Sequence, residues 1–393
     1  MLLPVRTLPR LLIATTLVSA AALTLSACQG ADYNAATVIT VQQQPDCETV
    51  DYAAATEIKN LIGGTVSSET IDGFLANRME ALNVPGTSVA IINDRQVVYH
   101  RTLGVTNTNT GAPITNCSIF QGASITKPLF GYFVMTFVED GELDLDRPLY
   151  EYLPYPDIAH DDRYKTITAR MALTHQSGFP NWRSDSEDKR LTIQFDPGTG
   201  FSYSGEGYQY LSLVLQEIAG VDHAGLEALF QERVAKPFGM IHTQVIPSDA
   251  LLQRRVYPHV DGKPAIVREE NSYQDFGAAY GVHSEAADFS KWLIGLMNEE
   301  GLSDASFKTY FARQNVPVPQ DDNPLILSQD YALGFVVYDT PLGELYAHNG
   351  NNPGFSSLIA VERKQGWGVV IFSNGNQTSD LGLELTLFMN TPS

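Results

Sequence analysis

The sequence predicts an α+β fold: a mainly antiparallel sheet built from N- and C-terminal strands and flanked by helices, with an inserted all-helical region. Two observations carry this prediction. Short β-branched runs occur at residues 87–101 and again between 334 and 373, whereas residues from about 128 to 300 form helical patterns and long polar loops. Strands at both ends of the chain, with helices between them, indicate one sheet assembled from distant segments.

Residues 71–82 are expected to form the first helix, because their apolar side chains recur near helical spacing. A hairpin follows, with strands at 87–92 and 96–101 around the turn Asn93-Asp94-Arg95. Further helices are expected at 128–139, 166–174, 207–219, 224–235 and 285–298. The later strands are expected at 334–338, 345–347, 357–362 and 367–373, and a short apolar helix near 381–389 follows them.

The first 27 residues are typical of a secretory signal, because two arginines precede an apolar run over 11–25 that holds no acidic residue. The four residues that end at Cys28 resemble the lipobox of bacterial lipoproteins, which implies cleavage before Cys28 and a lipid anchor on it. Gln29 favours the outer membrane of a Gram-negative bacterium, facing the periplasm. The alternatives are an ordinary signal peptide cut near Ala27 and a transmembrane anchor, although a bilayer needs roughly 20 apolar residues.

Residues 28–65 are expected to form a polar tether or N-terminal arm, because periodic apolar residues are scarce there. Residues 66–393 then form one domain. With Cys28 lipidated, Cys47 and Cys117 remain, both in an oxidising compartment. They could form a disulfide, or be two unrelated buried thiols.

The charge balance argues against nucleic acid as a partner. The chain has 25 lysines and arginines against 45 acidic residues, a formal net charge of −20. Removal of a signal that holds two arginines and no acid makes the mature chain more acidic still. Such a surface repels phosphate backbones.

Ser124-Ile125-Thr126-Lys127 is the strongest indication of chemistry. A serine at the first turn of a helix, with a lysine amine three residues on, is a device that makes serine nucleophilic without a histidine. Residues i and i+3 share one helix face, and an apolar stretch over 129–138 follows at once. The same spacing recurs at Ser186 and Lys189, but that copy lies in a charged run typical of a solvated loop.

Two downstream segments could complete such a site. Tyr203 lies among turn residues that open a helix, where a phenol with a pKa lowered by Lys127 could act as general base. Taken alone, a tyrosine there is more often a packed aromatic. His348-Asn349-Gly350 lies at the end of an expected strand, and a glycine there lets a substrate approach the backbone closely.

Several stretches within about residues 66–375 occur in the order of a known family. They are residues 84–86, 120–127, 143–146, 173–178, 197–208, 236–240 and 348–350. Together they resemble the serine β-lactamases and penicillin-recognising hydrolases, in the branch of class C β-lactamases, D-alanyl-D-alanine carboxypeptidases and related esterases. The resemblance implies a β-lactamase/transpeptidase-like fold and a serine hydrolase.

The resemblance also implies roles for individual residues. Ser124 would be the acylated nucleophile, Lys127 the group that orders its proton, and Tyr203 the base for acylation and, through water, for deacylation. The oxyanion hole would consist of the backbone N–H groups of Ser124 and Asn351, beside the substrate-binding triad that ends at Gly350.

Two departures from the family pattern bear on the substrate. Gly205 stands where the Tyr-x-Asn motif has its amide, and His348 stands where the Lys-Thr-Gly triad has its lysine. The histidine is mostly neutral at pH 7 unless its pKa is raised. Both changes suit a neutral ester or amide better than a β-lactam or a peptide that ends in D-alanine.

The other histidines indicate little. In His160-Asp161-Asp162, adjacent residues rarely converge on one metal ion, and no His-Glu-x-x-His motif is present, so neither a metal nor a cofactor is expected. His283 either lines the pocket or is a loop residue with no role.

We therefore expect an exported, lipid-anchored serine hydrolase of the esterase or peptidase kind, acting on a small ester, amide or peptide. One alternative is a D-alanyl-D-alanine carboxypeptidase or class C-type β-lactamase. Another is a non-catalytic binding protein of the cell envelope. Nothing in the sequence indicates an oligomeric state.

Overall fold

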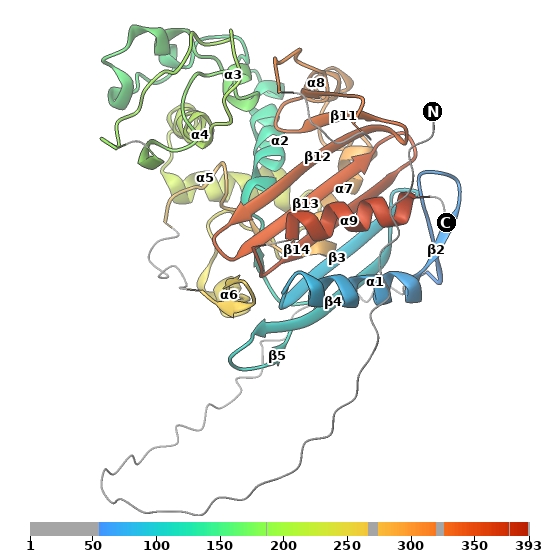
Figure 1. Cartoon of the computed structure of the whole chain (residues 1–393). Helices are drawn as coiled ribbons and strands as arrows, with labels where there is room; N and C mark the ends of the chain where they lie inside the picture. The colour runs from blue at the N-terminus through green and yellow to red at the C-terminus, as the bar shows by residue number, and fades with distance from the viewer. Residues whose placement is uncertain (1–54, 186, 266–273, 320–325, 377, 392–393) are drawn as a thin grey trace, which may run out of the picture. The chain divides into compact units, whose positions relative to one another are not determined.

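The computed structural model describes residues 55–391 except 186, 266–273, 320–325 and 377 (Figure 1). The expected signal, the expected lipidation site Cys28 and the cysteine Cys47 all lie outside the described residues. None of the described helices combines the length and the apolar character needed to cross a membrane.

One antiparallel sheet dominates the described chain, and its strands come from both ends of the sequence. The strand order is β10-β11-β12-β13-β14-β3-β4-β5. The bounds are β3 Gly86–Asn93, β4 Gln96–Asn107, β5 Ala112–Pro113, β10 Ser328–Tyr331, β11 Val336–Thr340, β12 Gly343–Asn352, β13 Phe355–Glu362 and β14 Trp367–Ser373. The two halves join where β14 pairs with β3, with Ile371 opposite Val89. The predicted fold class is confirmed.

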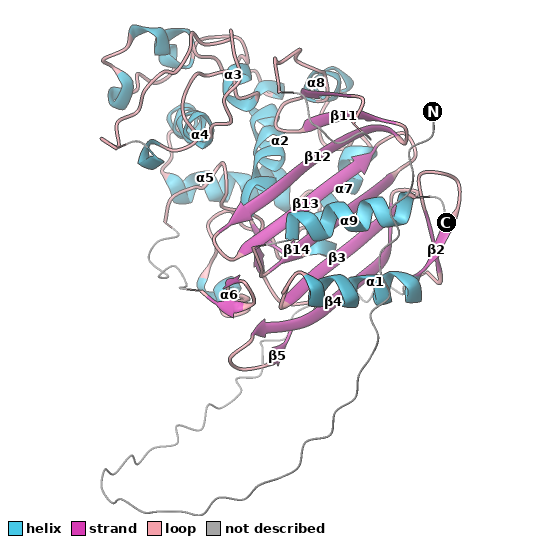
Figure 2. Ribbon diagram, viewed as in Figure 1, coloured by secondary structure: helices cyan, strands magenta, loops and turns pink. Residues whose placement is uncertain are grey.

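Helices cover both faces of this sheet (Figure 2). On one face, α1 (Ser68–Ala81) and α9 (Thr378–Asn390) pack together, and the rings of Phe74 and Phe388 stack with centroids 4.2 Å apart. On the other lie α2 (Thr126–Glu139), α7 (Ala286–Met297) and α8 (Asp304–Tyr310). Successive strand residues point to opposite faces of the sheet. Val89 therefore packs in the hydrophobic cluster beneath α1 and α9, and Ala90 in the cluster beneath α2, α7 and α8. Both faces of β3 are consequently buried.

The last residues of the predicted tether, before residue 65, are already part of the folded domain. β1 (Glu57–Lys59) pairs with β2 (Thr65–Ser67), and Ile58 is fully buried in the cluster beneath α1. Ser67 caps α1 by accepting a hydrogen bond from the backbone N–H of Thr70. The apolar residues here are too few to form a period, which is why the sequence pattern does not reveal this packing.

The inserted region is mainly helical. Its α-helices after α2 are α3 (Ala169–Leu173), α4 (Gly205–Ala219), α5 (His223–Phe230) and α6 (Asp249–Leu252). The region expected to be all-helical, about 128–300, also holds short strands. Within it β7 (His259–Val260) pairs with β8 (Lys263–Pro264), and β9 (His283–Ser284) pairs with β6 (Phe120–Gln121), which lies just before the region. These two-residue ladders are too short to leave an alternating pattern.

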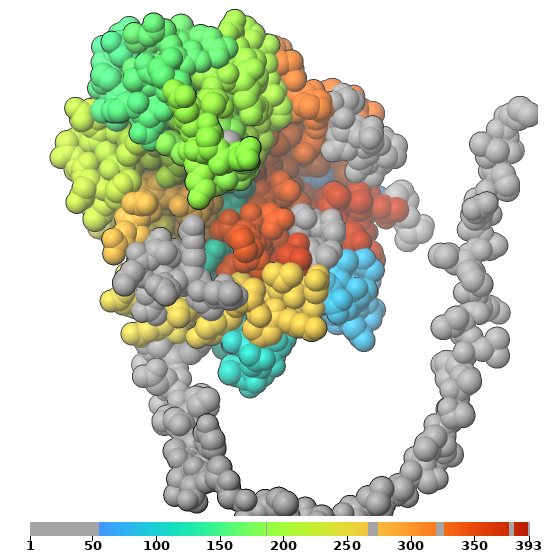
Figure 3. Space-filling view, turned by 60° about the vertical axis from the view of Figure 1, so that its left-hand side comes forward, coloured from blue at the N-terminus to red at the C-terminus, as the bar shows by residue number. Residues whose placement is uncertain are grey.

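Two predicted helices differ in detail from the structure. The expected helix at 166–174 begins only at Ala169, because the side chain of Thr168 accepts a hydrogen bond from Met171 and caps that end. The expected helix at 224–235 is α5, followed by the π-helical segment Gln231–Ala235. Figure 3 shows the green and yellow surface of the inserted region beside the orange and red surface of the C-terminal strands.

Candidate active site

A cavity of about 640 Å³ opens at the N-terminal end of α2. Ser124, Lys127, Tyr203 and Asn351 are among its lining residues, so the structure brings four of the predicted site residues together. They come from the segment before α2, from α2 itself, from the loop before α4, and from β12.

Ser124 lies in the short 3-10 helix η1 (Ala123–Ile125), directly before α2. Its predecessor Ala123 has a positive φ of 49°, an unfavourable conformation for a residue with a side chain. The side chain of Thr126 donates to the carbonyl of Ala123 at 2.5 Å, which holds this tight turn. The nucleophile segment is therefore presented on a strained turn where strand β6 leads into a helix.

Lys127 is buried in α2 with its amine at the serine. Its side chain is 1 % exposed, and Nζ lies 3.1 Å from the Ser124 Oγ and 2.8 Å from the carbonyl oxygen of Ala279. Burial disfavours the ammonium form and lowers the pKa of Lys127 to about 7. Near neutral pH a large fraction of the molecules thus hold a neutral amine, whose lone pair can take the proton of the Ser124 hydroxyl.

Tyr203 faces both residues. The Lys127 Nζ lies 4.5 Å from the centre of its ring, and the phenol is hydrogen-bonded to the Ser124 side chain. Burial raises the pKa of Tyr203, more than the hydrogen bond from Ser124 lowers it. The prediction that Lys127 lowers this pKa is therefore wrong: the amine lies over the ring in a poorly solvated site. The phenol is protonated at neutral pH and can donate a hydrogen bond.

His348 lies on β12 and is 3 % exposed. Burial, and then the proximity of Lys127, lower the pKa of His348 to about 3, so the imidazole is neutral at pH 7, as the sequence predicts. Its Nδ1 lies 2.5 Å from the carbonyl oxygen of Asn349, which fixes the proton on that nitrogen. The triad therefore brings no positive charge to the site.

Gly350 lets β12 approach the nucleophile segment. A Cβ there would lie 2.3 Å from the carbonyl oxygen of Gly122 and 3.0 Å from the backbone nitrogen of Ser124. The Ser357 Oγ would be nearer still, at 2.2 Å. The glycine is therefore needed for the packing of β12 against the protein itself, whereas the sequence predicts that it makes room for the substrate. This packing brings the strand that carries Asn351, the second expected oxyanion donor, beside the N–H of Ser124.

One wall of the cavity is aromatic, and the tryptophan in it was not predicted. Trp182 and Tyr280 meet edge to face with ring centroids 5.6 Å apart, and both line the cavity. A Cβ on Gly205 would lie 2.4 Å from the Trp182 indole, so the tryptophan occupies the space that a side chain at 205 would need. The only sequence signal for this arrangement is Gly205 itself, because residues 182 and 280 meet only in the folded chain.

An ion pair fixes the loop that carries this tryptophan. The Arg183 guanidinium lies 2.7 Å from a carboxylate oxygen of Glu206, which is buried at the start of α4. The Glu206 carboxylate also accepts the backbone N–H of Arg183 at 2.8 Å. The aromatic wall is thereby tied to the same helix that Tyr203 precedes.

Arg255 is another residue of the cavity wall that sequence reasoning missed. It follows Leu252, and its backbone forms a parallel bridge with Ile119. Among the described lining residues no carboxylate is found, and Arg255 is the one permanent cation. No local pattern around Arg255 in the sequence distinguishes it from a surface arginine.

The remaining predicted residues lie as follows. His283 lines the cavity and is buried, which lowers its pKa to about 4. His160 is exposed, and the carboxylate of Asp161 pairs with Arg163 at 2.6 Å. Cys117 is disulfide-bonded, and Cys47, which the sequence offers as a possible partner, lies outside the described residues.

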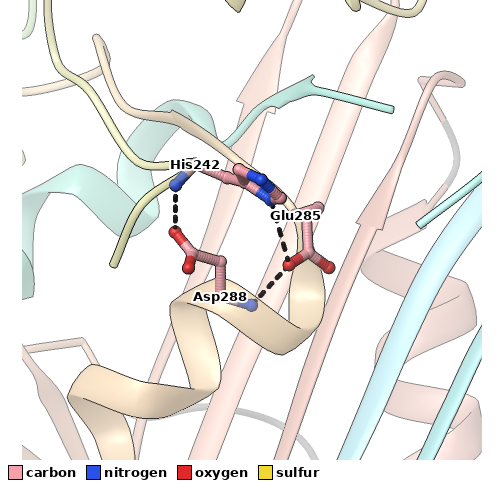
Figure 4. A group of neighbouring side chains, drawn as sticks. All are labelled: His242, Glu285 and Asp288. Atoms are coloured by element: carbon pink, nitrogen blue, oxygen red, sulfur yellow. Dashed lines mark hydrogen bonds and ion pairs between the residues drawn. The ribbon is translucent and has the colours of Figure 1, made fainter. Parts of the chain in front are cut away.

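A buried cluster of His242, Glu285 and Asp288 has the composition of a metal site (Figure 4). Its carboxylates, however, are already occupied. The two Asp288 oxygens accept from backbone N–H groups at 3.1 and 2.8 Å, from Thr243 and from Lys291. Both Glu285 oxygens accept backbone N–H groups of the first turn of α7. The cluster is thus explained as a structural one that fastens α7.

Comparisons with known proteins agree with this geometry. The family described as Beta-lactamase matches residues 71–388. Protein flp of Staphylococcus aureus (strain MW2) is 23% identical over 331 residues, which cover 79% of this chain and 64% of that protein. The unguisins hydrolase ungD of Aspergillus violaceofuscus is 23% identical, with 80% and 63% covered. Penicillin-binding protein 4* of Bacillus subtilis is 23% identical, with 67% and 62% covered. The chain spans less than two thirds of the length of these relatives.

Two solved structures share the fold. The octameric penicillin-binding protein homologue from Pyrococcus abyssi superposes with a TM-score of 0.70 at 22% identity, covering 83% of this chain and 78% of that one. The D-alanine carboxypeptidase AmpC from Burkholderia cenocepacia superposes with a TM-score of 0.65 at 20% identity, covering 82% and 97%.

Proposed function

Because the chain belongs to the β-lactamase family of serine hydrolases, we propose that it hydrolyses a neutral ester or amide, of the esterase or peptidase kind, through an acyl-enzyme on Ser124. The observation that carries this proposal is the 3.1 Å contact between the Lys127 amine and the Ser124 hydroxyl, with the pKa of the lysine lowered to about 7. A base that is poised near the working pH is what general base catalysis requires.

In the proposed acylation step, neutral Lys127 accepts the proton of the Ser124 hydroxyl while Oγ forms a bond to the substrate carbonyl carbon. The carbonyl oxygen becomes an oxyanion, which the backbone N–H groups of Ser124 and Asn351 stabilise. When the tetrahedral intermediate collapses, the bond to the leaving group breaks, and the proton held by Lys127 passes to that group. In deacylation neutral Lys127 accepts a proton from a water molecule while the water oxygen forms a bond to the acyl carbon. The bond between that carbon and the Ser124 Oγ then breaks, and Oγ takes the proton back from Lys127.

Tyr203 has a different role in this scheme from that of a phenolate base. Because its pKa is raised, the phenol keeps its proton and donates a hydrogen bond. It can pass its proton to the leaving group while it takes one from Lys127, so that the pair acts as a relay. The lysine is then the base, and the tyrosine the donor.

The wall of the cavity supports the substrate class. Neutral His348 offers no cation to a substrate carboxylate. The Trp182 indole fills the space beside Gly205, where the family motif has an amide. One observation favours the alternative of a D-alanyl-D-alanine carboxypeptidase or class C-type β-lactamase: Arg255 lines the same cavity and could hold a carboxylate from another side.

We also propose export to the cell envelope, with a lipid anchor on Cys28 that holds the protein at the outer membrane, facing the periplasm. The disulfide of Cys117 supports this proposal, because such bonds persist in oxidising compartments. Expression in a Gram-negative host tests it. The protein should fractionate with the membrane, and a Cys28→Ala variant should not carry the lipid mass; an unlipidated wild type would contradict the proposal.

Turnover measurements distinguish the proposed activities. Wild type should hydrolyse p-nitrophenyl butyrate faster than a chromogenic cephalosporin or a peptide ending in D-alanyl-D-alanine, and Ser124→Ala should abolish the activity. Faster release from the cephalosporin or the peptide, also lost in Ser124→Ala, would establish the alternative. If a fluorophosphonate probe failed to label the wild type at all, the protein would be a non-catalytic binding protein.

A further inference from the structure

His175 is a fully buried histidine that the proposed mechanism does not use. It follows α3 and has a positive φ of 60°, which is uncommon for a residue other than glycine. Its ring lies against Tyr203, with centroids 4.3 Å apart and an angle of 36° between the planes. A strained backbone beside a proposed site residue is a reason to ask what it maintains.

Two hydrogen bonds join His175 to the residues on either side of Tyr203. The backbone N–H of Ser202 donates to the carbonyl oxygen of His175 at 3.0 Å. The backbone N–H of Ser204 donates to the His175 Nδ1, also at 3.0 Å. One residue therefore holds the backbone before and after Tyr203 and also packs against its ring.

We propose that His175 is a positioning residue that holds Tyr203 in hydrogen-bonding reach of Ser124, and that it acts as a fixed acceptor with no part in proton transfer. This inference rests on the proposed function, because it assigns a residue that supports the Ser124, Lys127 and Tyr203 chemistry.

The surroundings of the imidazole explain why it stays an acceptor. Since Nδ1 accepts the Ser204 N–H, the ring proton is on Nε2. A second proton would occupy the Nδ1 lone pair, make that nitrogen a donor and break the bond from Ser204. Burial, Lys127 and His348 all lower the pKa of His175, so the ring remains neutral. Within the described part of the chain, Nε2 has no hydrogen-bond partner to which it could pass a proton.

Two substitutions separate the acceptor from the backbone strain. Asparagine and glycine both tolerate a positive φ, but only the asparagine amide oxygen can replace Nδ1. We expect His175→Asn to keep kcat for p-nitrophenyl butyrate within about threefold of wild type, whereas His175→Gly should lose about 100-fold in kcat with little change in KM. His160→Asn, at an exposed histidine, is the matched control.

A double-mutant cycle with Tyr203→Phe distinguishes positioning from general destabilisation. If His175 acts through the Tyr203 phenol, His175→Gly should lower kcat much less in the Tyr203→Phe background than in wild type. An equal loss in both backgrounds would overturn the proposal. So would a folded His175→Asn variant, with the melting temperature of wild type, that had lost 100-fold in kcat, because the imidazole would then take part in the chemistry.

The proposed function and this inference can fail separately. If wild type neither turns over the ester nor reacts with a fluorophosphonate at Ser124, the proposed function is wrong. If wild type does both and folded His175→Gly matches it in kcat, the proposed function stands and the role of His175 is wrong.

Discussion

Replacement of Lys127 by methionine should stabilise the protein, and the gain should shrink as the pH rises. In the folded protein burial lowers the pKa of Lys127 to about 7, whereas an unfolded lysine titrates near 10.5. Between these values the unfolded chain binds more protons than the folded one, so the free energy of unfolding of the wild type rises with pH. A methionine has no such linkage.

The magnitude follows from the pKa difference. At about 1.4 kcal/mol per pKa unit, burial of the lysine costs the wild type roughly 4 kcal/mol at pH 7 and roughly 2 kcal/mol at pH 9. Methionine also loses the hydrogen bond to the carbonyl of Ala279, which offsets the gain by about 1 kcal/mol at either pH. The difference between the two pH values is therefore the cleaner quantity, about 2 kcal/mol.

Urea unfolding of wild type and Lys127→Met at pH 7 and pH 9 measures this difference directly. Lys308→Met, at an exposed lysine on α8, is the control and should show no comparable change with pH. If the stability gap between wild type and Lys127→Met were the same at both pH values, Lys127 would not be the group with the lowered pKa, and its assignment as the neutral base would be refuted.

Three further predictions concern activity on p-nitrophenyl butyrate. The value of kcat/KM should rise with pH to a plateau, with an apparent pKa near 7, because only neutral Lys127 accepts the Ser124 proton; a flat profile from pH 5 to 9 would contradict this. Gly350→Ala should lower kcat by about 100-fold, since its Cβ would collide with the carbonyl of Gly122 and displace β12. If steady-state kinetics gave the kcat of wild type for this variant, the strand would have room for the methyl group and the prediction would be wrong. Arg183→Met should raise KM several-fold with a small effect on kcat, because the Trp182 loop borders the cavity but does not touch the reacting bond; a loss confined to kcat would place this loop in the chemistry.

The nucleophile and its lysine could be located from the sequence because their contact is local. Ser124 and Lys127 are three residues apart on a helix, and helix geometry alone brings their side chains together. Tyr203 and His348 lie far away in the chain, so their placement rested on the order of family motifs. The neutral state of His348 was predictable from its residue type, whereas the raised pKa of Tyr203 depends on burial that a linear pattern does not record.

Other parts of the site follow from packing between distant segments. The indole of Trp182 beside Gly205, and the position of Arg255 in the cavity wall, come from loops with no periodic pattern. The same limit applied to the fold: the large sheet followed from clear β-branched runs, but the two-residue ladder of β6 and β9 did not.

The most direct test of the account is to find the residue that becomes acylated. Intact-protein and peptide mass spectrometry after incubation with a fluorophosphonate or a slowly turned-over ester should show one adduct, on Ser124. The adduct should form much more slowly in Lys127→Met and be absent in Ser124→Ala. An adduct on any other residue, or labelling of Ser124 at the same rate in Lys127→Met, would contradict the claim that a buried neutral lysine activates this serine.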